Sequence, residues 1–150
     1  MSKRSEAIQT ASAPAAIGPY SQAIRSGDLL FCSGQIGLDP VDGTLVGGGL
    51  EQQASRVLDN LQAVLEAAGG SLADILKVTV YLTDLSGFPT LNAIMEGRLT
   101  APYPARATVE VSALPLGALV EIDVIARIAG PGDAQGAAQG LKTTGGEADA

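Results

Sequence analysis

The stretch "LEQQASRVLDNLQAVLEAAGG" (residues 50–70) carries the clearest structural signal in the chain. Its apolar side chains recur every three or four residues, the spacing that places them along one side of an α-helix. Polar residues lie mostly off this stripe, and Gly69-Gly70 supplies a C-terminal stop. The pattern therefore predicts an amphipathic helix over residues 50–68, with an apolar stripe made of Leu50, Ala54, Val57, Leu58, Leu61, Val64, Leu65 and Ala68.

The residues after this helix predict one strand, a second helix and two further strands. Ser71 and Asp74 are placed to cap a short turn. The string "KVTVYLTD" (77–84) then alternates apolar and polar residues, as a half-buried strand does. Residues 87–99 predict a helix with Pro89 in its first turn and with Phe88, Leu91, Ile94 and Met95 facing inward. Two more strands are expected at 105–111 and 119–128, joined by "SALPLGA".

The residues before the first helix are harder to assign. A short strand is expected within 5–10 and another from residue 29 to about residue 33, broken by Gly34. The small, proline-punctuated stretch 11–24 is interpreted as an irregular loop that presents Tyr20. Asp42-Gly43 is a strong hairpin-turn signal.

This order of strands and helices predicts an α+β fold with both helices on one face of a mixed sheet. The other face also needs a cover if it is apolar, and no further helices are available, so we expect an oligomer. We interpret residues 1–129 as one domain and the Gly- and Ala-rich residues 130–150 as a disordered tail.

The composition argues against several classes of protein. The 150-residue chain has a formal net charge of −7 and no histidine. A phosphate backbone repels an acidic chain, so nucleic acid is not an expected partner. Without histidine the commonest general base and metal ligand are missing, and no other metal or cofactor motif appears, so we expect neither a metal nor a cofactor.

The single cysteine and the hydropathy pattern add two expectations. Cys32 has no partner for an internal disulfide and is interpreted as a small buried apolar residue. No apolar run reaches the 18 or so residues of a membrane span, and the N-terminus does not resemble a signal peptide. We therefore predict a cytoplasmic protein that makes no membrane contact.

A few polar residues interrupt apolar surroundings and are candidates for a site. Arg106 begins a small, apolar strand, while Glu121 and Asp123 share one face of the last strand. Tyr20, Ser33 and Asn92 are further candidates. Each also has a purely structural interpretation: Arg106 as a surface residue, Asn92 as an exposed helix position, and the two carboxylates as a solvent face or as partners of Arg127. The pattern alone leaves both interpretations open.

Five blocks of sequence, taken in order, closely resemble the Rid family of enamine and imine deaminases. The blocks are "PAAIGPYSQAI", "SGQIGLDP", "NLQAVLEAAGGSLADILKVTVYLTD", "PARATVEV" and "LPLGALVEIDVIA", and the likeness covers about residues 5–129. The resemblance implies a chorismate-mutase-like α+β fold. It also implies a homotrimer with clefts between subunits, in agreement with the cover that the second sheet face needs.

The same resemblance implies an activity and a set of site residues. The implied reaction is hydrolysis of 2-aminoacrylate and related 2-imino acids to 2-keto acids and ammonia. Arg106 matches the arginine that binds the substrate carboxylate, and Glu121 matches the acidic residue that orients water and passes protons. The remaining matched positions line the cleft: Tyr20, with a catalytic role, and Ser33, Asn92 and Thr108, which contact the substrate.

The chain departs from the family pattern at positions that bear on substrate preference. Met95 stands where an aromatic residue is common, and Leu116 where a basic residue often follows Leu-Pro. The segment between Asn92 and Arg106 is also shorter than usual. Two alternatives to the small-substrate deaminase therefore remain: a related deaminase of a larger, aminomuconate-type dienamine, and a non-catalytic binding or chaperone-like trimer.

Overall fold

The computed structural model describes residues 5–129 of the chain. The proposed tail, residues 130–150, lies outside the described residues. Within the described part, six strands form one sheet in the order β1-β2-β3-β6-β4-β5. The strands are β1 (Glu6–Ile8), β2 (Ala23–Ser26), β3 (Leu29–Gln35), β4 (Ile75–Leu82), β5 (Ala105–Glu110) and β6 (Val120–Arg127).

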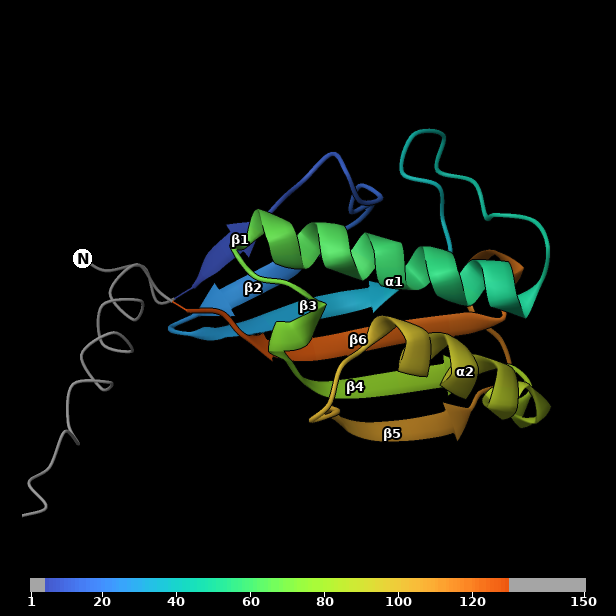
Figure 1. The fold of residues 1–150 in the computed structure, drawn as a ribbon. Helices are drawn as coiled ribbons and strands as arrows, with labels where there is room; N and C mark the ends of the chain where they lie inside the picture. The colour runs from blue at the N-terminus through green and yellow to red at the C-terminus, as the bar shows by residue number, and fades with distance from the viewer. Residues whose placement is uncertain (1–4, 130–150) are drawn as a thin grey trace, which may run out of the picture.

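The sheet is mixed, as the sequence predicts. β4 and β5 pair in parallel, and all other neighbouring strands are antiparallel. The helices are α1 (Leu50–Ala67) and α2 (Phe88–Arg98), and both cover the same face of the sheet (Figure 1). Three short 3-10 turns complete the fold: η1 (Leu72–Asp74), η2 (Leu85–Gly87) and η3 (Pro115–Gly117).

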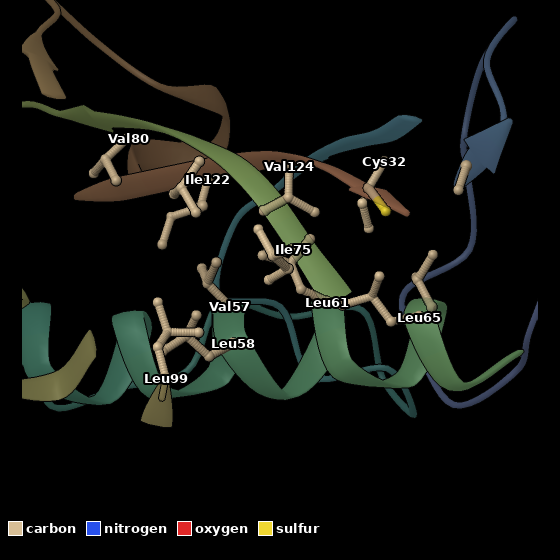
Figure 2. Close-up of a cluster of buried hydrophobic side chains, with 14 of the residues drawn as sticks. Cys32, Val57, Leu58, Leu61, Leu65, Ile75, Val80, Leu99, Ile122 and Val124 are labelled. Atoms are coloured by element: carbon tan, nitrogen blue, oxygen red, sulfur yellow. The ribbon is translucent and has the colours of Figure 1, made fainter. Parts of the chain in front are cut away.

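The apolar stripe of α1 forms the centre of the core. Leu58, Leu61 and Leu65 point from the helix towards the sheet, which contributes Ile122 and Val124 of β6 and Cys32 of β3 to the same cluster (Figure 2). These side chains are almost fully removed from water. Burying a leucine or isoleucine side chain contributes about 1.5–3 kcal/mol, so this helix–sheet contact holds the two layers together.

Most predicted elements are confirmed, including both helices and the cap at Ser71 and Asp74. In this capping box the Ser71 side chain accepts from the Ala73 amide, and the Asp74 side chain accepts from the Ser71 amide. Two predictions are wrong. Residues 23–26 form β2, not a loop, and Gly34 does not end β3, which continues to Gln35 through an irregularity in its pairing with β6. The chain does turn at Asp42-Gly43, but the segments on either side pair only through the isolated bridge between Leu38 and Leu45 and form no strands.

The second face of the sheet is uncovered within the described residues. A row of side chains in register crosses it from Ile24 through Phe31 and Ile125 to Lys77. Phe31 is exposed, and Ile24 and Ile125 are partly exposed. An apolar row on a sheet surface is typical of a contact with another chain.

Within residues 5–129, no helix combines the length and the apolar character needed to cross a bilayer. The cytoplasmic location stays a prediction.

The core makes a direct prediction about stability. Leu61→Ala should lower the free energy of unfolding by about 2–5 kcal/mol, because a fully buried leucine leaves a cavity. The control Leu76→Ala removes a substantially exposed leucine of β4 and should cost less than about 1 kcal/mol. Urea unfolding at one fixed protein concentration measures both; equal losses would contradict this description of the core.

Candidate active site

The six residues predicted for the site fall into two groups. Arg106 pairs in register with Val78, and Thr108 pairs with Val80. Both valines are buried beneath the helices. Because residues directly opposite each other in a sheet project from the same face, Arg106 and Thr108 project on the helix-covered face.

Arg106 is oriented by residues of α2. Its Nη1 donates a hydrogen bond to Asn92 Oδ1 (2.6 Å) and lies 3.9 Å from the sulfur of Met95. Its guanidinium carbon lies 4.9 Å from the centre of the Phe88 ring, a cation–π contact. The Asn92 amide and the Phe88 ring therefore hold the guanidinium plane at the edge of the sheet.

The other side of the guanidinium is unused. Within residues 5–129, neither Nε nor Nη2 of Arg106 makes a hydrogen bond, and no carboxylate lies within ion-pair distance. An arginine edge with two parallel N–H groups is suited to a planar carboxylate. Arg106 is also one of the residues that line a hollow of about 480 Å³, together with Asn92, Met95, Glu96, Leu99, Tyr103 and Pro104.

Thr108 contributes a second polar group on this side of the sheet. Its Oγ1 is buried and has no hydrogen-bond partner within the described residues. A buried hydroxyl without a partner costs free energy, about 1–3 kcal/mol in mutational data. Thr108 does not line the hollow beside Arg106, so within one chain its hydroxyl is enclosed and unpaired.

Tyr20, Ser33 and Glu121 form the second group, on a different hollow. Glu121 lies between the buried residues Val120 and Ile122 of β6, so its side chain projects on the uncovered face. All three residues line a hollow of about 490 Å³, together with apolar residues that include Ile17, Ile36 and Leu116.

Hydrogen bonds to backbone groups, most of them from side chains, hold the residues of this second hollow in place. Ser33 Oγ donates to the Ser21 carbonyl, and the Ser33 amide donates to the Gln22 carbonyl at 3.0 Å. The buried Gln22 side chain accepts from the amide of Thr10 and donates to the carbonyls of Thr10, Ala13 and Pro14. Gln22 therefore stabilises the loop between β1 and β2, which carries Tyr20. The sequence around Gln22 gives no sign of this role.

Glu121 has a raised pKa. Partial burial is the main cause, because it disfavours the charged form, and the negative charge of Asp123 adds to the effect. Asp123 does not pair with Arg127, as one interpretation of the sequence had it. It accepts a hydrogen bond from the Tyr81 hydroxyl (2.9 Å), while Arg127 pairs with Asp28 at 3.4 Å.

Gly34 makes room for Glu121, and this role was missed at the sequence level. A Cβ built on Gly34 would lie 2.7 Å from Oε2 of Glu121 and 2.8 Å from its carboxyl carbon. Only a glycine can therefore lie beside this carboxylate as it is placed. The sequence shows Gly34 as an interruption of a strand, and such interruptions often mark a close approach.

Within a single chain the two groups do not meet. Arg106, Thr108 and Asn92 lie on the helix side of the sheet, whereas Glu121 projects from its other side and shares its hollow with Tyr20 and Ser33. The described residues contain no cluster of three or more His, Cys, Asp or Glu side chains that could hold a metal ion. Cys32 is buried, as predicted, and burial raises the pKa of its thiol to about 12.

Comparison with known proteins assigns the fold to one family. The family model described as "Endoribonuclease L-PSP" matches residues 10–128. The chain is 51% identical over 120 residues to the RutC family protein y4sK of Sinorhizobium fredii, covering 80% of this chain and 95% of that protein. It is 45% identical over 124 residues to the bovine 2-iminobutanoate/2-iminopropanoate deaminase, covering 83% of this chain and 90% of that protein.

Solved structures agree with this assignment. RidA from an Antarctic Psychrobacter species superposes with a TM-score of 0.80 at 50% identity, over 82% of this chain and 99% of that one. Escherichia coli TdcF, solved with bound serine, gives a TM-score of 0.76 at 39% identity, over 83% of this chain and 99% of that one.

The contact between Gly34 and Glu121 can be tested directly. Gly34→Ala should displace the Glu121 carboxylate towards water and lower its raised pKa towards the ordinary value, as an NMR titration of the side-chain carboxyl would show. The fold should lose less than about 1 kcal/mol, because the clash is with the free end of a flexible side chain.

Gly97→Ala is the matched control. A Cβ on Gly97 of α2 meets nothing within 4 Å, so this change should leave the Glu121 pKa unaltered and stabilise the helix by about 0.5–1 kcal/mol. An unaltered Glu121 pKa in Gly34→Ala would contradict the proposed contact.

Proposed function

The chain belongs to the Rid family, and on this premise we propose that it is a hydrolytic deaminase of 2-aminoacrylate and related 2-imino acids. The products are a 2-keto acid and ammonia. The proposal is supported by relatives named imine deaminases and by one solved relative that holds serine, a small amino acid with a free carboxylate.

The single observation that carries the proposal is the unused edge of Arg106. The guanidinium is held by Asn92 and Phe88, its Nε and Nη2 groups make no hydrogen bond within the described residues, and Arg106 lines the hollow of about 480 Å³. A 2-imino acid presents a planar carboxylate that this edge can bind with two parallel, charge-assisted hydrogen bonds. Thr108 is assigned to the same ligand because it projects on the same sheet face as Arg106, two residues along β5, and its hydroxyl lacks a partner within the described residues.

We also propose that the working form is a homotrimer whose active sites lie between protomers. Carboxylate binding and proton transfer must act on one small substrate, yet Arg106 and Glu121 project from opposite faces of the sheet. The exposed apolar row through Phe31 and Ile125 offers a surface for the contact. A neighbouring protomer then brings its Arg106 hollow to the Glu121 hollow of the next.

The reaction needs only proton transfers and one water. The enamine of 2-aminoacrylate gains a proton at its terminal carbon and becomes an iminium. Water then adds to the imine carbon and loses a proton, which gives a carbinolamine. Its amino nitrogen gains a proton and leaves as ammonia, while the hydroxyl loses a proton and becomes the ketone. Glu121 is assigned these proton transfers, since it is the only carboxylate that lines its hollow and its raised pKa makes its acid form more accessible than that of an ordinary glutamate.

Tyr20 and Ser33 are assigned to the same step. Both line the hollow that holds Glu121, and the Tyr20 side chain is exposed to it. Their hydroxyls can hydrogen-bond the attacking water or the departing nitrogen, and holding these groups in place lowers the entropic part of the barrier.

One observation supports the alternative of a larger, dienamine-type substrate. Met95 contacts Arg106 and lines its hollow where the family often has an aromatic residue. A flexible thioether yields more readily than a ring to a long ligand. A nuclease, which the description of the matching family suggests, is disfavoured by the charge of −7 and the lack of histidine.

The proposed activity predicts a specific loss in Arg106 variants. Ammonia release from 2-aminoacrylate generated enzymatically should exceed the rate without protein. Arg106→Ala should lower kcat/KM by about 10²–10³-fold, because two charge-assisted hydrogen bonds are lost, and Arg106→Lys should restore it only in part. Arg56→Ala, which removes a positive charge from α1, should retain full activity. No acceleration by the wild-type protein would disprove the deaminase.

The composite site predicts complementation between inactive variants. Arg106→Ala and Glu121→Gln, each inactive alone, should regain activity when they are co-expressed, since a mixed trimer contains sites with both intact halves. Random assembly in equal amounts gives such a site at about a quarter of the interfaces. Activity is measured per trimer, with light scattering to confirm the mass; mixed trimers without activity would show that both groups act from one chain.

A further inference from the structure

Leu116 holds an unfavourable backbone conformation. Its φ of 57° and ψ of 21° lie in the left-handed region, and within residues 5–129 it is the only residue other than glycine with a positive φ. A branched side chain is disfavoured there by contact between its Cβ and the backbone. Strained residues of this kind persist where their surroundings fix them, and they cluster at functional sites.

The segment around Leu116 is fixed by a hydrogen bond across the turn and by contacts of the residues that follow it. The Ala118 amide donates to the Pro115 carbonyl (3.1 Å), and Ala118 itself is buried. The Leu119 amide donates to the side chain of Gln53 on α1 (2.8 Å), and the Leu119 carbonyl accepts from the Thr83 amide. The turn Pro115–Gly117 is therefore imposed by the fold, and a glycine at position 116 would adopt it without strain.

The leucine side chain gains little from packing in return. It is 70% exposed, although leucine is among the residues most often buried. It lines the same hollow as Glu121, Tyr20 and Ser33. Ile17, which is 87% exposed, lines that hollow too. Two large aliphatic side chains thus border the proposed catalytic carboxylate and are exposed in the single chain.

The charge of the hollow restricts what can lie against these side chains. Glu121 is the only charged residue among those that line it, and the remaining polar groups are Tyr20, Gln22, Ser33 and Gln35. No lysine or arginine of the described chain lines it. A second carboxylate on a substrate would therefore meet a negative or neutral apolar surface and would be disfavoured.

We propose that Leu116 and Ile17 form a subsite for an aliphatic substrate side chain, so that the enzyme prefers 2-imino acids with side chains larger than methyl. This inference rests on the deaminase function proposed above and specifies its substrate class. Contact with the aliphatic side chain of a bound substrate gives Leu116 the apolar burial that it lacks in the free protein.

The test compares two imino acids of different size. An L-amino-acid oxidase generates the imino acids of alanine and leucine in place, and kcat/KM for ammonia release is measured for each. In the wild-type protein the leucine-derived imino acid should be preferred. Leu116→Gly should lower the ratio of the two kcat/KM values about tenfold, the effect of losing a few apolar contacts in a specificity pocket.

Three further measurements separate the subsite from other roles. Leu116→Met, which stays apolar, should keep the ratio within about twofold, whereas Leu116→Asn, which tolerates the left-handed conformation but is polar, should lower it as glycine does. Val41→Ser removes a 94% exposed apolar residue outside the hollow and should leave both rates unchanged. The melting temperature of Leu116→Gly should not fall.

Several outcomes would overturn the subsite. One is a wild-type protein that is active on both imino acids with a ratio that Leu116→Gly leaves unaltered. Another is loss of the trimer mass in Leu116→Gly, which would assign the side chain to a contact between copies. A wild-type protein that accelerates neither reaction would overturn the deaminase itself, and the subsite with it.

Discussion

The structure depends on the burial of one face of a six-stranded sheet under α1 and α2. Strand β6 shows the consequence most clearly, because Val120, Ile122 and Val124 enter the core while Glu121 and Asp123 project the other way. The alternation of a strand makes these two outcomes inseparable. The same residues that stabilise the two layers therefore place a pair of carboxylates on a face that the described part of the chain does not cover.

This arrangement explains why the candidate residues separate within one chain. Arg106 is held on the helix side by contacts that only α2 can make, through Asn92 and Phe88. Glu121 is held on the opposite side beside Gly34, where no Cβ intrudes. Side chains on opposite faces of a sheet point away from each other, so Arg106 and Glu121 of one chain cannot both contact one small molecule. The proposed association of protomers would bring Arg106 of one chain next to Glu121 of another.

Periodicity was enough to predict α1, β4 and β6, because burial on one side leaves a regular pattern in the sequence. It failed at β2, whose four residues include Ala23 and Ser26 and form a strand because β1 and β3 pair with them on both sides. The pattern of polar residues in apolar surroundings offered candidates for the site, but their roles, and Thr108 as a member, came from the family resemblance. Their division between two faces follows from the register of β5, and the contact of Gly34 with Glu121 is a long-range packing fact that no local pattern contains.

The electrostatics of the two halves fit an anionic substrate only if they act together. Arg106 attracts a carboxylate, whereas an ionised Glu121 beside Asp123 would repel it. Burial and the charge of Asp123 both raise the pKa of Glu121, and its acid form adds no negative charge when the substrate approaches. In the proposed reaction the acid form of Glu121 donates to the enamine carbon, and the carboxylate that this step leaves faces an iminium. The cationic intermediate would in turn stabilise that carboxylate, so the same pair of acidic residues suits both the binding of the anion and the hydrolysis of the cation.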